Sequence, residues 1–249
     1  MKLSSLIKRD IEEKAFAFRD NNGYGVMEPI ILSSLLLKKN IITVFKPLPG
    51  DFAGMAIKAD DNSLFIMINQ EHTIGRQNFT IGHELYHLCV QEKFTSGYCN
   101  AGLFDSQSDT EEKKADFFAA CLLLPRSGIH QLIPVHEALK KNNLSIETIF
   151  KIQQYYGLSI NAVIYRLIEL DYIDNSYFDK LATGKMSMAI KLGYDTILFK
   201  PGNFNKIIGD YGPLVNNLYK SQKISESVYL EFMNDINVDP LAPIENDIE

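Results

Sequence analysis

The stretch Asn78–Leu88 reads NFTIGHELYHL and is the most informative part of this chain. It contains two of the chain's five histidines, His83 and His87, and Glu84 follows the first of them directly. Two imidazoles and a carboxylate on a buried helix need partners, because unpaired buried polar groups are costly. The flanking residues are apolar at helical spacing, which predicts such a helix: Phe79, Ile81, Leu85 and Leu88.

The spacing of these three residues predicts a metal site with a catalytic base. Residues four apart share one face of an α-helix, with Cβ atoms about 5–6 Å apart. His83 and His87 can therefore direct nitrogens at one zinc ion, at about 2.0–2.1 Å each. Glu84 is rotated by about 100° from His83, so it misses the ion but can act as base on a water that the ion activates. The same spacing also occurs on ordinary helices, so a third ligand is needed.

A second helix, expected at residues 110–124, offers that ligand. The extension that would place a third histidine six residues after His87 is absent, because Lys93 occupies the position. Glu112 and Asp116 are four residues apart, on one helical face beside two alanines that permit close approach. We expect Glu112 to bind the metal and Asp116 to accept a hydrogen bond from a ligand histidine, fixing its orientation.

The remaining sequence predicts an α+β fold. A small antiparallel sheet leads into the helix that carries His83, and a helical segment follows. We expect a main domain at residues 1–175 and a smaller C-terminal α+β accessory region at 176–249, whose acidic tail from residue 240 should be mobile. The other expected helices are 4–19, 28–39 and two within 144–170 separated at Gly157, and the expected strands are 41–45, 54–58, 64–68 and 196–199.

Composition narrows the class of protein. Hydrophobic residues make up 46% of the chain, enough for a packed core. The formal charge of −6 and the pI near 5.4 argue against a nucleic-acid partner, which usually requires clustered cations. No apolar run approaches the roughly 20 residues of a membrane helix. The three cysteines lack CxxC spacing and the N-terminus lacks a signal-peptide pattern, so we expect a cytoplasmic protein.

Taken together, the motifs resemble those of the ImmA/IrrE family of zinc metallopeptidases, over roughly residues 28–173. The matching motifs are Arg76-x-x-Phe79-Thr80-x-x-His83-Glu84-x-x-His87, Glu112-x-x-Ala115-Asp116-x-Phe118-Ala119 and Leu122–Pro125.

This resemblance implies a zincin-like catalytic fold with adjoining helices. By position, His83, His87 and Glu112 match the family's zinc ligands and Glu84 its catalytic base, whereas Asp116 stands where the family often has Asn. Members cleave a helix-turn-helix repressor, often encoded beside them on mobile elements or in stress-response loci. The resemblance therefore implies an endopeptidase whose partner is a helix-turn-helix transcriptional repressor or an antitoxin.

Two other functions are compatible with the sequence. The chain can be a non-proteolytic regulatory binding protein, an anti-repressor or toxin–antitoxin component with structural zinc. Residues 149–167 also have helix-turn-helix rhythm, but Arg166 is the only cation of the would-be recognition helix, and major-groove readers normally present several polar and basic side chains. Some roles stay open: Arg76 is expected to brace its helix, and the oxyanion donor can be Tyr98, Tyr155, Tyr156 or Tyr172.

Overall fold

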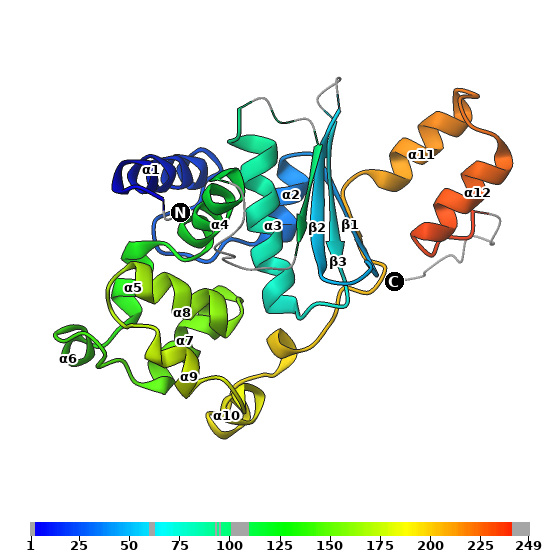
Figure 1. Ribbon diagram of the computed structural model, residues 1–249. Coiled ribbons are helices and arrows are strands. Elements are labelled where there is room, and N and C mark those ends of the chain that lie inside the picture. Colours follow the sequence, from blue (N-terminus) through cyan, green and yellow to red (C-terminus); the bar gives the residue numbers. More distant parts are fainter. Residues whose placement is uncertain (1–2, 60–62, 93, 95, 101–109, 241–249) are drawn as a thin grey trace.

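The computed structural model describes residues 3–59, 63–92, 94, 96–100 and 110–240, the stretch 96–100 by its backbone only. A five-stranded sheet stands beside the central helix α3, with α1 and α4 beyond it and α5–α10 gathered at one end (Figure 1). The predicted tail lies, from residue 241 on, outside the described residues.

The elements are as follows. The helices are α1 Ser5–Asn21, α2 Leu32–Lys38, α3 Ile74–Cys89, α4 Thr110–Leu123, α5 Arg126–Leu132, α6 Val135–Ala138, α7 Ile146–Tyr156, α8 Ile160–Glu169, α9 Ser176–Lys180, α10 Lys185–Lys191, α11 Tyr211–Lys220 and α12 Glu226–Asp235. The strands are β1 Ile41–Lys46, β2 Phe52–Lys58, β3 Leu64–Asn69, β4 Ser96–Asn100 and β5 Ile207–Ile208, and η1 Ile197–Phe199 is a 3₁₀ helix.

The sheet is mixed, with strand order β4-β2-β3-β1-β5. The predicted hairpin is present, because β2 and β3 pair antiparallel. However, β1 pairs parallel to β3, with Ile41 opposite Leu64, so the sheet is not antiparallel throughout as expected. The chain reverses at β2 and again at β3, and β3 rather than β2 lies beside β1. The fold is α+β, as predicted.

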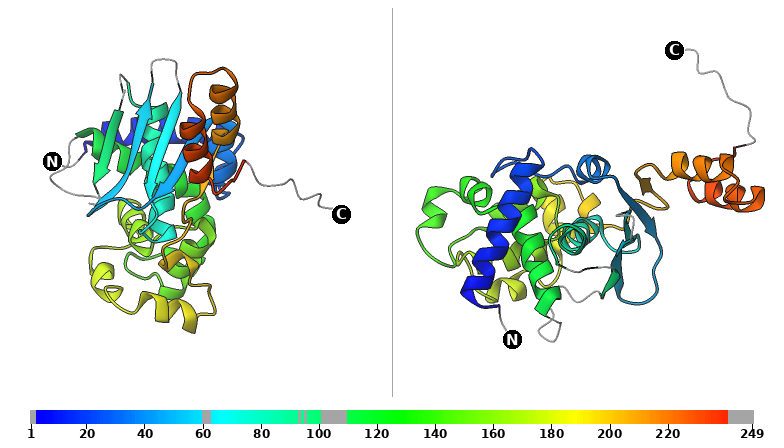
Figure 2. Two further views of the ribbon diagram at one scale, coloured as in Figure 1. Left: turned by 90° about the vertical axis from the view of Figure 1, so that its right-hand side faces the viewer. Right: turned by 90° about the horizontal axis from the view of Figure 1, so that it is seen from above.

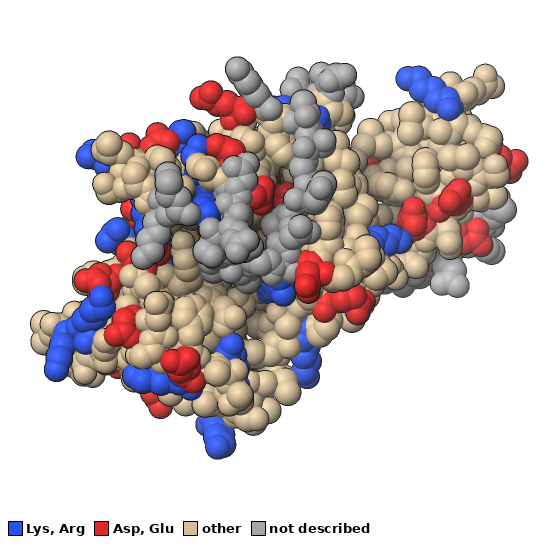
Figure 3. Space-filling model, in the orientation of Figure 1, with Lys and Arg blue, Asp and Glu red and all other residues tan. Residues whose placement is uncertain are grey.

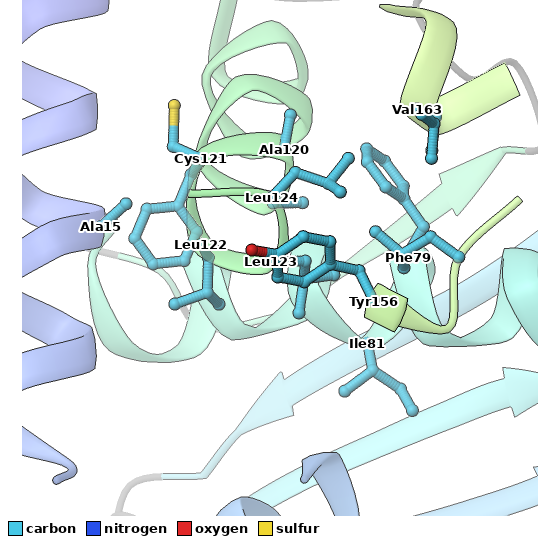
Figure 4. Close-up of a cluster of buried hydrophobic side chains, with 14 of the residues drawn as sticks. Ala15, Phe79, Ile81, Ala120, Cys121, Leu122, Leu123, Leu124, Tyr156 and Val163 are labelled. Atoms are coloured by element: carbon cyan, nitrogen blue, oxygen red, sulfur yellow. The ribbon is translucent and has the colours of Figure 1, made fainter. Parts of the chain in front are cut away.

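Close contact between α3 and α4 brings the predicted site residues together. A Cβ atom on Gly82 would lie only 2.7 Å from Cδ1 of Leu123, so a larger residue here would require the Leu123 side chain to move. Ala115 and Ala119, the two alanines of α4 beside Glu112 and Asp116, are fully buried. Figure 4 shows the end of α4 and the following Leu124 lying among side chains of α1, α3, α7 and α8. The two helices therefore form one rigid packed unit.

The second helix starts later than predicted, at Leu32 rather than at Glu28. The reason lies in Arg19, which is only 2% exposed and donates hydrogen bonds to the carbonyl oxygens of Gly25 and Glu28. These bonds hold residues 25–28 as a loop, and a sequence pattern does not reveal such a tertiary contact.

The predicted strand at 196–199 is wrong, because residues 197–199 form η1. The side chain of Asp195 accepts a hydrogen bond from the amide of Ile197, at 2.8 Å, and such a local bond favours a turn over a strand. Leu198 is buried and η1 packs against α3. The apolar residues that predicted a strand are therefore part of a 3₁₀ turn that packs against α3.

The helix pair α7–α8 is present as predicted and breaks at Gly157, whose φ of +66° ends α7. Its second helix, α8, is largely buried in the core. Arg166 is only 1% exposed, because its guanidinium donates to the carbonyl of Leu124 and to Glu12. Positive and negative side chains are also intermixed on the face shown in Figure 3.

Within residues 176–240, one strand joins the central sheet and the last two helices lie outside it. β5 pairs antiparallel with β1, with Thr43 opposite Ile208, and so adds a strand to the sheet. The hairpin of α11 and α12 then stands on the far side of the sheet from α3 (Figure 2). The boundary predicted at residues 175/176 stays a prediction. Within the described part of the chain, no helix is long and apolar enough to span a membrane.

Candidate metal centre

The five predicted site residues come from two adjacent helices. His83, Glu84 and His87 lie on α3, while Glu112 and Asp116 lie on the first turns of α4. The three α3 residues and Asp116 are buried, and the side chain of Glu112 is one-third exposed. The site therefore lies within the protein interior, and Glu112 marks its solvent side.

Three groups direct ligand atoms at one point. Nε2 of His83 lies 3.1 Å from Nε2 of His87 and 3.1 Å from Oε2 of Glu112. Nε2 of His87 lies 3.4 Å from Oε1 of Glu112. In a tetrahedral zinc site with bonds of about 2.0–2.1 Å, ligand atoms are separated by about 3.3–3.4 Å. The separations here fit such a site.

The hydrogen bonds of the two imidazoles are also consistent with a metal site. Nδ1 of His83 lies 2.9 Å from Oδ1 of Asp116, and Nδ1 of His87 is bonded to Oε1 of Gln91. Both partners are acceptors, so each Nδ1 carries the hydrogen and each neutral ring presents a lone pair at Nε2. Burial, and then the neighbouring His83, lower the pKa of His87 and favour its neutral form. Three acceptor groups thus face one another, which suits a cation between them.

Glu84 is the most buried carboxylate of the site, at 1% exposed. Burial raises its pKa to about 8, and nearby Glu112 adds to this rise, while His83 opposes it. Among the described residues, Oε1 of Glu84 has no hydrogen-bond partner although it is buried. A carboxyl group in this setting can accept and release a proton, which is the property of a general base.

Two further residues contact the site without having been predicted. Gln91, four residues after His87, holds the outer nitrogen of that ring as Asp116 does for His83. This spacing was a usable signal, although α3 ends at Cys89. The ring of Phe94 stacks on His87 with centroids 5.2 Å apart, and no sequence pattern pointed to it.

The tyrosines considered as oxyanion donors do not single out one residue. The hydroxyl of Tyr156 donates to the carbonyl of Met27, and that of Tyr172 is bonded to Nδ1 of His130. Tyr155 is about half exposed and packs edge-on against Tyr156. The side chain of Tyr98 lies outside the described residues.

Asp116 provides a test of the orienting hydrogen bond. We expect Asp116→Ala to weaken metal binding about 10–100-fold, the usual effect of losing such a partner, because the His83 ring loses its anchor. Asp116→Asn keeps an acceptor oxygen at the same place and should stay within a few-fold of wild type. Competition with a chromophoric chelator measures both affinities. Equal affinity in Asp116→Ala and wild type would show that the bond does not orient His83.

The fold and the site define a zincin-like metallopeptidase domain. The chain matches the family Peptidase_M78, described as the IrrE N-terminal-like domain, over residues 38–168, which is more than half of its length. It therefore belongs to this family, as the resemblance of its motifs predicted.

Solved and curated proteins were also compared with the chain. It is similar to a solved structure of a Mycobacterium tuberculosis transcriptional regulator, with a TM-score of 0.39 and 19% sequence identity over 64% of this chain. The match spans 46% of that regulator's length. A comparison with curated proteins found no significant match.

Proposed function

We propose that this protein is a zinc-dependent endopeptidase that cleaves a regulatory protein in the cytoplasm. The observation that carries the proposal is the convergence of His83, His87 and Glu112 beside the buried, unpartnered carboxylate oxygen of Glu84. Three protein ligands with a fourth position free for water or substrate are typical of catalytic rather than structural zinc sites. Membership of a peptidase family supports the same activity.

In this proposal each residue of the site has a separate task. A bound zinc ion would polarise the scissile carbonyl and make water more acidic. His83, His87 and Glu112 would hold that ion, and Asp116 keeps the ring of His83 in place. The carboxylate of Glu84 takes a proton from the attacking water and later gives it to the nitrogen of the leaving amine.

The proposed substrate is a helix-turn-helix transcriptional repressor or an antitoxin. This part of the proposal rests on membership of the family rather than on a contact in the structure. We expect the substrate to bind in an extended form along an edge of the sheet, pairing through its main chain. The edge strands are β4 and β5.

The function can be tested with whatever helix-turn-helix protein is encoded next to this gene. Incubating it with the zinc-loaded enzyme should give two fragments, and a chelator should prevent their formation. Mass spectrometry of the fragments locates the cut. A stable complex of the two proteins without cleavage would instead favour a non-proteolytic regulatory binding protein whose zinc is structural.

A further inference from the structure

A cavity lies at the start of α3, lined by none of the residues of the candidate metal centre. Its volume is about 430 Å³, within the range of small-molecule sites. The walls come from the N-terminal ends of α3 and α8, from the first residue of α10 and from η1. Segments distant in sequence thus meet around one hollow, and no part of the proposed peptidase mechanism uses it.

Two cations face this cavity from different parts of the chain. Arg76 comes from the first turn of α3, and Lys185 begins α10. Lys185 donates a hydrogen bond of 2.8 Å to the neutral amide of Asn161, and no described carboxylate lies within 4.0 Å of its ammonium group. Burial lowers the pKa of Lys185. A partly desolvated ammonium group gains from an added counter-ion.

Other polar features of the cavity favour an anion as well. His72, whose ring can donate a hydrogen bond, also lines the cavity. Neither α3 nor α8 has an acidic residue in its first turn to offset the positive end of its helix dipole. One carboxylate, that of Glu71, also lines the cavity, but this residue is exposed.

The remaining wall is apolar. Ile160 is 2% exposed, Leu198 is 9% exposed and Phe199 is partly buried, and all three line the cavity. A bare inorganic ion would leave this wall uncovered. The cavity therefore fits a ligand that has a charged head and an apolar body.

We propose that this cavity binds a small organic anion, with a carboxylate or phosphate head between Arg76 and Lys185 and an apolar body against Ile160, Leu198 and Phe199. Such an anion can come from two sources. It is either a free small molecule or a polypeptide segment in which an acidic residue is next to an aromatic residue. Binding ties α10 to α3. Arg76 precedes His83 by seven residues, which is two turns on one helical face, or about 10.5 Å along the axis.

Calorimetric titration of the whole protein tests this site without any measure of peptidase activity. The probes are phenyl phosphate, inorganic phosphate and the capped dipeptide N-acetyl-phenylalanyl-glutamic acid amide. We expect phenyl phosphate or the dipeptide to bind and to raise the melting temperature. The tighter of these two probes identifies the source of the head group. Lys185→Met should weaken that binding about tenfold or more, through loss of a charged hydrogen bond.

Lys191→Met is the matched control. Lys191 ends the same helix, is exposed and lies outside the cavity, so its replacement removes the same charge without touching the site. Arg76→Lys keeps the charge at the second cation and should retain binding. Absence of binding by both organic probes would overturn the proposal. Equal loss in Lys185→Met and Lys191→Met would also overturn it, as would binding of inorganic phosphate as tight as that of phenyl phosphate.

Discussion

Replacing Glu84 by glutamine is expected to lower the cleavage rate about 100- to 10,000-fold, the usual contribution of a general base. Glutamine has nearly the same shape but cannot accept the proton from water. The metal should stay bound, because Glu84 lies beside the ligand set rather than in it. Initial rates on the cleaved protein, measured with the metal content of the same samples, give both quantities.

The melting temperature of Glu84→Gln distinguishes a loss of cleavage activity from a folding defect. Burial raises the pKa of Glu84, so its charged form is disfavoured inside the fold. A neutral glutamine should therefore leave the melting temperature unchanged or raise it. Glu147→Gln, an exposed change on α7, is the control for losing a carboxylate. Full activity of Glu84→Gln with metal bound would show that another group is the base.

Glu112→Ala is expected to remove the metal. It deletes one of three protein ligands, so its effect should exceed the 10–100-fold loss that follows removal of a residue bonded to a ligand. Cleavage should fall with the metal, because a bound ion would supply polarisation of the carbonyl and activation of water. Metal analysis after dialysis against a competing chelator measures the loss, and added zinc should restore activity only at high concentration.

Glu111→Ala is the control that the chain offers next to Glu112. Glu111 bonds to Lys114 and to the hydroxyl of Tyr86, so it belongs to the same helical turn without reaching the ligand cluster. It should keep its metal. If Glu111→Ala and Glu112→Ala lost metal equally, the third ligand would have been assigned to the wrong residue.

The metal centre could be predicted largely because helical geometry is local. The spacing of His83 and His87 places both rings on one face, whatever surrounds them. Glu112 and Asp116 followed from the same rule, and the neighbouring alanines indicated that their helix can approach closely. Gln91 was missed because it lies beyond the end of α3.

The rest of the fold depends on contacts that have no local signature. Arg19 donates hydrogen bonds to carbonyl groups of the loop before α2, and α2 therefore begins further along the chain than the sequence predicts. The strand order, with β3 beside β1, is set by packing and not by the runs of β-branched residues that predicted the strands. The cavity at the start of α3 joins Arg76 and Lys185, which no sequence spacing relates.

The X-ray absorption spectrum of the zinc-loaded protein at the zinc edge tests most directly whether two imidazoles and one carboxylate hold a zinc ion in this protein. We expect two imidazole nitrogens and oxygen ligands at about 2.0–2.2 Å, and loss of this signature in Glu112→Ala. A shell of sulfur atoms at about 2.3 Å, or the absence of imidazole scattering, would contradict the assignment.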